Sequence, residues 1–193
     1  AGSMKCLLEE KITDLDAQIT HLQAVRATLC THHRNMETLL SMDLSEISIV
    51  EKEERCLVTV DVDRNTSFEQ EVELITAETE KYRLGRLHKA SYGSMLPVAD
   101  LLNGSFDNYS RLFIEIPFLP YQAGLHITPK GKYLRAFHKG DWSSIPNRYR
   151  EILAYAGEHG LTLNGYSYEM GINENVIDRI EDYIVQIEIP VTG

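Results

Sequence analysis

The chain has 193 residues, which is enough for about one to one and a half ordinary domains. Hydrophobic residues make up 43% of the sequence, so it can bury a sizeable core. The 29 acidic residues outnumber the 19 basic ones, and the net charge is −10. A surface of this charge repels nucleic-acid phosphates and attracts cations. The composition therefore argues against a self-sufficient DNA-binding protein.

The cysteines indicate the compartment. Cys6, Cys30 and Cys56 are odd in number and lack a CxxC spacing, which favours reduced thiols over a disulfide framework or a zinc site. No apolar run reaches the roughly 18 residues of a membrane span, and no signal peptide precedes the first helix. We therefore expect a cytoplasmic protein. Residues 1–3 read Ala-Gly-Ser, which resembles a cloning scar, and they are set aside.

Residues 4–42 are predicted to form one long helix, because residues 5–42 contain no proline or glycine. Its apolar residues recur at alternating steps of four and three, a heptad pattern interrupted by Arg26: Leu8, Ile12, Leu15, Ile19, Leu22 and Leu29. Such a stripe needs a partner. It either packs on the chain's own domain or pairs with a second copy, and the heptad spacing favours a dimeric coiled coil.

An internal repeat organises the rest of the chain. Residues 113–117 read Phe-Ile-Glu-Ile-Pro and residues 186–190 read Gln-Ile-Glu-Ile-Pro, an offset of 73. The first unit places a strand at 56–62, a helix at about 68–83, and strands near 91–101 and 110–117. In the second unit the strand at 133–137 precedes a helix capped by Ser143 or Ser144 and stopped by Gly160, then strands near 165–172 and 183–190.

The repeat predicts an α+β domain over residues 45–193, with pseudo-repeats at about 45–118 and 122–191. Two β-α-β-β units side by side can form one antiparallel sheet. We expect both helices to cover one face of this sheet and a concave ligand cleft to occupy the other face.

Three segments carry a family resemblance. Residues 7–29 resemble a dimerisation helix, and Lys139-Gly-Asp-Trp-Ser-Ser-Ile-Pro146 resembles the entry to the second helix of GyrI-like domains. Residues 165–169 and 183–191 resemble the final two strands of those domains. Together they make the chain similar to the effector-binding part of MerR-family multidrug-responsive transcription regulators of the BmrR kind. The resemblance covers nearly the whole chain.

This resemblance implies binding of lipophilic, often cationic, aromatic molecules, and a role as a transcription activator when a DNA-binding domain is attached. No such domain is expected here, since residues 4–42 lack a helix-turn-helix break. The chain is therefore interpreted as a truncated regulator or as a free-standing relative. The expected partners are a small-molecule effector and a second copy of the chain, with DNA contacted only through an upstream domain.

A flat cation loses its hydration on binding, and contacts with aromatic faces and a carboxylate offset that cost. The predicted elements supply both kinds of side chain, and the ligand-binding candidates are Tyr92, Tyr109, Trp142, Tyr149, Tyr166, Tyr168, Glu169, Tyr183, Gln186 and Glu188. Strand alternation places Glu169 on the face opposite Tyr166 and Tyr168, and it places Gln186 and Glu188 on one face. For each single tyrosine the alternative is a residue at the edge of the core.

The identity of the pocket acid stays open. The family pattern usually has glutamate where this chain has Gln186, so Glu188 or Glu169 would have to take that role. Glu115 is the repeat partner of Glu188, and both could instead be solvated near strand ends. Some GyrI-like relatives are hydrolases with a catalytic glutamate, which makes a hydrolase the competing class. We expect a receptor rather than an enzyme, with no metal and no cofactor.

Overall fold

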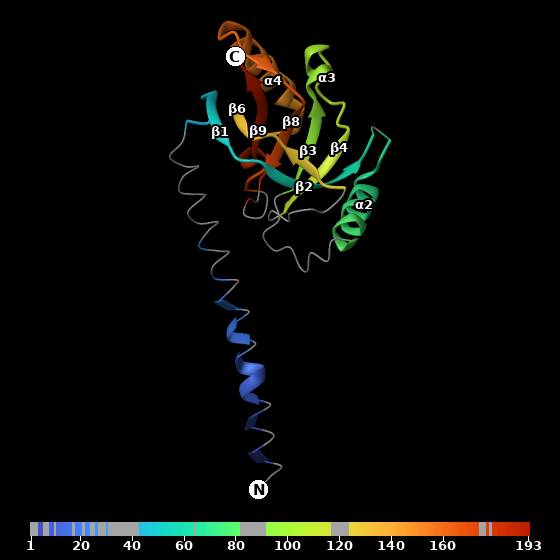
Figure 1. Ribbon diagram of the computed structural model, residues 1–193, viewed down its shortest axis with the longest axis vertical. Coiled ribbons are helices and arrows are strands. Elements are labelled where there is room, and N and C mark those ends of the chain that lie inside the picture. Colours follow the sequence, from blue (N-terminus) through green and yellow to red (C-terminus); the bar gives the residue numbers. More distant parts are fainter. Residues whose placement is uncertain are drawn as a thin grey trace. The chain divides into compact units, whose positions relative to one another are not determined.

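Figure 1 shows the computed structural model. The structure describes residues 4–5, 8–9, 11–16, 18–20, 22–23, 26, 30, 43–63, 65–81, 92–116, 124–173, 177 and 179–193. The chain divides into two compact units, Ala1–Met42 and Asp43–Gly193. No described helix is long and apolar enough to cross a membrane.

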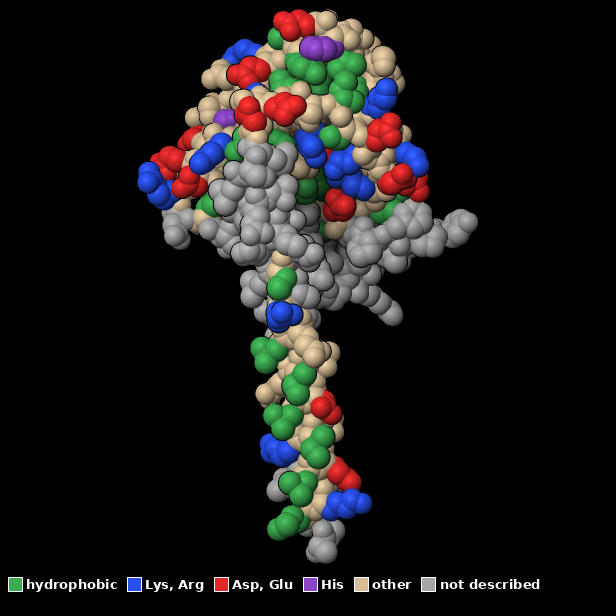
Figure 2. All heavy atoms as spheres, turned by 90° about the vertical axis from the view of Figure 1, so that its left-hand side faces the viewer, with side chains coloured by type: hydrophobic (Ala, Val, Ile, Leu, Met, Phe, Trp, Pro, Cys, Tyr) green, Lys and Arg blue, Asp and Glu red, His purple; other side chains and the backbone are tan. Residues whose placement is uncertain are grey.

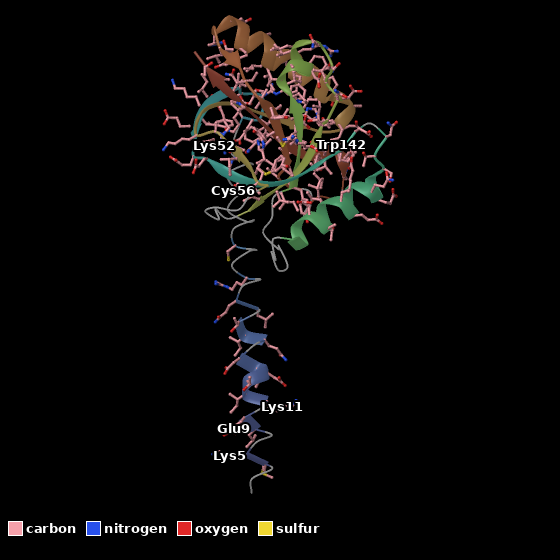
Figure 3. All side chains as sticks on the ribbon, turned by 45° about the vertical axis from the view of Figure 1, so that its right-hand side comes forward. Lys5, Glu9, Lys11, Lys52, Cys56 and Trp142 are labelled. Atoms are coloured by element: carbon pink, nitrogen blue, oxygen red, sulfur yellow. The ribbon has the colours of Figure 1, made fainter. Side chains whose placement is uncertain are left out.

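The described residues between 4 and 30 are helical. Lys5 and Glu9, which are labelled in Figure 3, lie one helical turn apart and form an ion pair with 3.8 Å between the lysine amine and a carboxylate oxygen. The predicted apolar positions are more than half exposed, and Figure 2 shows hydrophobic side chains in a stripe along this helix: Leu8, Ile12, Leu15, Ile19 and Leu22. Leu29 and residues 31–42 of the predicted helix lie outside the described residues.

The second unit contains one antiparallel sheet with the strand order β1-β6-β9-β8-β3-β4-β2-β5, and β7 pairs with β9 beside this path. The strands are β1 (Ser48–Lys52), β2 (Arg55–Asp61), β3 (Tyr92–Pro97), β4 (Arg111–Ile116), β5 (His126–Thr128), β6 (Gly131–Lys139), β7 (Thr162–Leu163), β8 (Tyr166–Gly171) and β9 (Ile184–Thr192). Strands β1, β5 and β7 were not predicted from the sequence. Strand β9 also continues past Pro190, where the prediction ended it.

The sheet has an approximate two-fold arrangement. The central strands β3 and β8 pair with Met95 opposite Tyr168, two residues that are 73 apart in the sequence. On one side of this pair lie β4 and β2, and on the other side lie β9 and β6. In the sequence, a helix of 14 residues lies between the two strands of each outer pair: α2 (Phe68–Lys81) between β2 and β4, and α4 (Ile145–Glu158) between β6 and β9. The same order of elements therefore occurs on both sides of the centre.

Both long helices pack on the same face of the sheet. Ile75 of α2 belongs to one buried cluster with Val58 and Ile114, while Ile152 of α4 belongs to another with Ile187. Residues that are paired across neighbouring strands share a face of the sheet, so the register shows that both clusters lie on one face. The row of paired positions runs from Val58 through Ile114 to Tyr92, and from Ser94 on the same strand as Tyr92 through Glu169 and Ile187 to Ala136. A short helix, α3 (Val98–Leu102), follows β3. Figure 1 shows α2 and α4 over different parts of the sheet.

The turn before α4 differs slightly from the prediction. A 3-10 turn, Trp142–Ser144, is capped by Asp141, whose side chain accepts a hydrogen bond from the backbone N–H of Ser143. Ser144 is the N-cap of α4 but makes no side-chain capping bond, since its Oγ donates to the carbonyl of Asp141 instead. Gly160, at φ 63°, ends the helix in the left-handed region as predicted.

The expected position of the ligand cleft was wrong. The face without long helices is filled by the protein's own side chains, which form a cluster with at most 4% exposure: Leu57, Met95, Phe113, Tyr133 and Tyr168. Gly93 lets this cluster close, because a Cβ atom there would overlap the ring of Phe113 and the carbonyl of Glu169. The hollow of the sheet lies on the other face, beside the helices.

Candidate functional site

A cavity of about 540 Å³ lies between α2 and the helix-bearing face of the sheet. Strands β3, β4, β8 and β9 form its floor, and α2 and the turn before α4 form its walls. Its size is in the range of small-molecule sites. Its lining is Glu71, Val72, Ile75, Thr76, Tyr92, Gly93, Ser94, Tyr109, Leu112, Phe113, Trp142, Glu169, Met170, Gly171, Tyr183 and Val185.

Glu169 is the buried acid of this cavity, with only 5% of its surface exposed. Strand alternation on β8 turns it toward the helices, opposite Ser94 of β3. Tyr109 donates a hydrogen bond of 3.0 Å to the carboxylate, and Tyr149 of α4 donates another of 2.5 Å. Tyr149 also contacts the hydroxyl of Ser167 at 2.8 Å. The carboxylate is therefore fixed by two phenols, and no cation among the described residues pairs with it.

Burial raises the pKa of Glu169 to about 7, although the hydrogen bonds from Tyr149 and Tyr109 act in the opposite direction. The pKa of both tyrosines is raised, first by burial and then by the charge of Glu169. Both phenols therefore stay protonated and remain donors. Near neutral pH the acid is divided between its two forms, so a cation that enters the cavity can favour the ionised form.

Aromatic side chains surround the entrance. Trp142 is 58% exposed and meets Tyr183 edge to face, with 5.4 Å between the ring centroids. Tyr92 is 49% exposed and lies on β3. The Asp141 cap fixes the turn that carries Trp142, whose side chain is labelled in Figure 3. Ring faces of this kind attract cations by their quadrupole, by about 0.5 to 2 kcal/mol for each good contact.

The charge of the lining has one sign. Glu169 and Glu71 are its carboxylic acids, and the described residues of the lining include no lysine, arginine or histidine. An apolar, aromatic hollow whose described charged groups are all negative disfavours anions and accepts cations.

The structure brings six of the ten predicted ligand-binding residues to this side of the sheet. Five line the cavity, and Tyr149 lies behind the acid as its donor: Tyr92, Tyr109, Trp142, Glu169 and Tyr183. The other four lie on the opposite face, where β8 and β9 turn them away from the helices: Tyr166, Tyr168, Gln186 and Glu188. The ten predicted residues are therefore divided between the two faces of the sheet, as expected for Glu169 relative to Tyr166 and Tyr168.

Glu188 belongs to a buried ion cluster and is not solvated, contrary to the alternative drawn from its strand-end position. Its carboxylate is 1% exposed and lies 2.7 Å from the amine of Lys52 and 3.2 Å from the guanidinium of Arg55. Arg55 also contacts Glu115 at 3.3 Å, and Glu115 is 34% exposed. The guanidinium lies 5.8 Å from the ring centroid of Tyr168. The aromatic rings and the acid on this face thus bind Arg55, a cation of the protein itself.

Two lining features were missed. Glu71 is a helix residue in an acidic run, so its sequence neighbours give no sign that it faces a cavity. The small residues of the floor, Gly93, Ser94 and Gly171, leave the space that the ligand would use. A glycine within an alternating strand is a signal for close approach, and Gly93 could have been singled out on that ground.

No protein-family model matches the chain. The chain is 24% identical over 189 residues to the multidrug-efflux transporter 2 regulator of Bacillus subtilis (strain 168), a match that spans 96% of this chain and 68% of the relative. The chain resembles a multidrug-efflux regulator over nearly its whole length. The predicted similarity to the effector-binding part of MerR-family multidrug-responsive regulators is therefore confirmed.

Solved structures agree on the fold. EcmrR in its complex with DNA superposes with a TM-score of 0.55 at 16% identity, over 96% of this chain and 71% of that chain. A hydrolase from Listeria innocua superposes with a TM-score of 0.52 at 12% identity, over 82% of this chain and 98% of that chain. These likenesses establish a curled antiparallel sheet of the GyrI-like kind for residues 43–193.

Proposed function

We propose that the cavity binds lipophilic, cationic aromatic molecules and that the chain is the effector-sensing part of a transcription activator of multidrug response. The observation that carries this proposal is Glu169, a buried carboxylate with two phenol donors and no cationic partner among the described residues. A buried acid of this kind is costly unless a charge or proton neutralises it. A cationic ligand supplies that charge, and the rings of Trp142 and Tyr183 supply its contact area.

The direct test compares two ions of the same shape and opposite charge. Tetraphenylphosphonium and tetraphenylborate are titrated into the protein by calorimetry. The phosphonium should bind with an affinity in the micromolar range and the borate should not bind, because the described part of the lining contains acids and no bases. Equal affinity for both ions, or binding of neither, contradicts the proposal.

Two variants locate the site. Glu169→Gln should weaken phosphonium binding by about tenfold or more, because the buried carboxylate that would pair with the cation is lost. Glu158→Gln makes the same change of charge at the exposed end of α4 and should leave the affinity unchanged. A loss of binding in both variants would point to the net charge of the protein rather than to the cavity.

We further propose that two copies pair through the N-terminal helix. Five apolar side chains at heptad spacing are each more than half exposed there, which leaves a stripe without a described partner: Leu8, Ile12, Leu15, Ile19 and Leu22. Pairing would carry an effector signal from the cavity to DNA-binding domains joined to the helix. DNA contact would come from such a domain, since EcmrR was solved bound to DNA while this chain is strongly acidic.

A hydrolase is the second candidate, and one observation favours it. A glutamate with a pKa near 7 in an apolar cavity suits a general base that activates water. Of the two glutamates predicted for that role, Glu169 lies in the cavity, whereas Glu188 lies on the other face and is paired with Lys52 and Arg55. Hydrolysis of ester or strained-ring substrates that is lost in Glu169→Gln would support an enzyme. The absence of turnover together with phosphonium binding favours the receptor.

A further inference from the structure

Glu71 is a second acid of the same cavity. It lies in the first turn of α2, one helical turn before Ile75, and both residues line the hollow. Its side chain is partly buried, and that burial raises its pKa. Within the described residues, no hydrogen bond or ion pair holds its carboxylate. Glu71 therefore faces the ligand space from α2 while Glu169 faces it from the sheet.

No other described residue of the lining carries a charge that would balance these two acids. The others are apolar, aromatic or uncharged polar side chains, and the hydroxyl of Tyr109 already donates to Glu169. A ligand with a single positive charge that sits at Glu169 leaves Glu71 partly desolvated, with no countercharge from the described residues. A second positive charge on the same ligand removes that cost.

We propose that the effector carries two cationic groups joined by an apolar linker, one bound at Glu169 and the other at Glu71. The inference rests on the proposed function, since it requires the cavity to be the cation site. The two groups differ in surroundings. The Glu169 end is enclosed by phenols, whereas the Glu71 end lies on the helix wall, where solvent screens the charge more strongly. The deep contact supplies most of the affinity, and the wall contact selects for the dication.

The test compares ligands that differ only in the second charge. Hexyltrimethylammonium is titrated against hexamethonium, which carries the same quaternary group at both ends, and the comparison is repeated with octyl and decyl linkers. At the best-matched linker the dication should bind about fivefold more tightly than its single-charge counterpart, because a partly exposed ion pair contributes at that scale.

A matched pair of variants assigns the effect to Glu71. Glu71→Gln should remove the preference for the dication and change the affinity of the single-charge ligand by less than about twofold. Glu73→Gln makes the same change of charge at an exposed position of the same helix and should keep the preference. Glu169→Gln should weaken both kinds of ligand.

Three results would overturn the inference: no preference for the dication at any linker length, an equal loss for both ligands in Glu71→Gln, or the same loss in Glu73→Gln. Failure of the proposed function is seen separately. If the proposed function is wrong, tetraphenylphosphonium itself does not bind. If phosphonium binds but a second positive charge does not raise the affinity, the proposed function stands and the dication inference is wrong.

Discussion

The buried acid predicts that ligand affinity and protein stability depend on pH in opposite senses. The pKa of Glu169 is raised from its usual 4.5 to about 7 in the folded protein. Between about pH 4.5 and about pH 7, Glu169 is therefore protonated in the folded state and ionised in the unfolded state. The stability that this proton provides is fully present below about pH 4.5 and is lost as the pH rises to about 7. A permanent cation, in contrast, binds the ionised form.

The magnitudes follow from the same shift. A difference of about two and a half pKa units corresponds to about 3 kcal/mol, and solvent screening is small because Glu169 is 5% exposed. Wild-type protein should thus lose about 3 kcal/mol relative to Glu169→Gln between low and neutral pH. Binding of a permanent cation should become about tenfold tighter from pH ~6 to pH ~8 as the carboxylate ionises.

The assays are urea unfolding and calorimetric titration of tetraphenylphosphonium, which has no titratable proton of its own. Both are run over the same pH series with wild type and Glu169→Gln. Titration in two buffers of different ionisation enthalpy counts the protons released on binding, and near pH ~7 about half a proton should leave. Glu169→Gln should bind more weakly and show no proton release.

Two results would refute this reasoning. One is a wild-type affinity that changes by less than about twofold across the pH series. The other is an identical pH dependence in Glu169→Gln, which would assign the titration to a different group. His126 has a lowered pKa because of burial and the charge of Arg111, but it lies with Tyr168 on the opposite face and is outside the cavity lining.

Further predictions concern the entrance, the opposite face and the helix. Trp142→Ala should weaken phosphonium binding about fivefold in titration and change the unfolding free energy by less than about 0.5 kcal/mol, because the ring is exposed; equal binding would remove Trp142 from the site. Arg55→Met should lower the unfolding free energy in urea by about 3 kcal/mol, since Glu188 loses a buried partner; a loss below about 1 kcal/mol contradicts the buried-pair argument. Leu15→Asp should convert a dimer to a monomer in sedimentation velocity, while Gln18→Asp should not; a wild-type monomer would exclude pairing.

The repeated segments show how far sequence reasoning reached. The offset of 73 between the two Ile-Glu-Ile-Pro segments reappears at the centre of the sheet, where Met95 lies opposite Tyr168. Strand alternation also placed Glu169 correctly on the face opposite Tyr168, because a period of two fixes the relation between neighbours on one strand. Helix limits near Gly160 followed from backbone preferences that act locally.

The choice of face could not be read in the same way. Alternation relates residues of one strand, so it does not place Glu169 of β8 relative to Glu188 of β9, and it does not say which acid meets solvent or ligand. The pairing of Tyr168 with Glu188 puts Glu188 on the face opposite Glu169. That choice depended on Arg55 and Lys52, which come from a distant part of the chain and neutralise Glu188 across the sheet. With its own arginine bound between aromatic rings, that face had no need of an external cation.

Spacing between near neighbours was enough to predict the duplicated β-α-β-β order, the heptad stripe of the first helix and the alternation of faces along each strand. The position of the cavity and the acids that line it could be read only from the folded chain. Helix α2 brings Glu71 over the sheet, and long-range pairing turns Tyr109 and Tyr149 onto Glu169. Contacts of this kind join residues far apart in the chain, and only the packing of helices against strands fixes them.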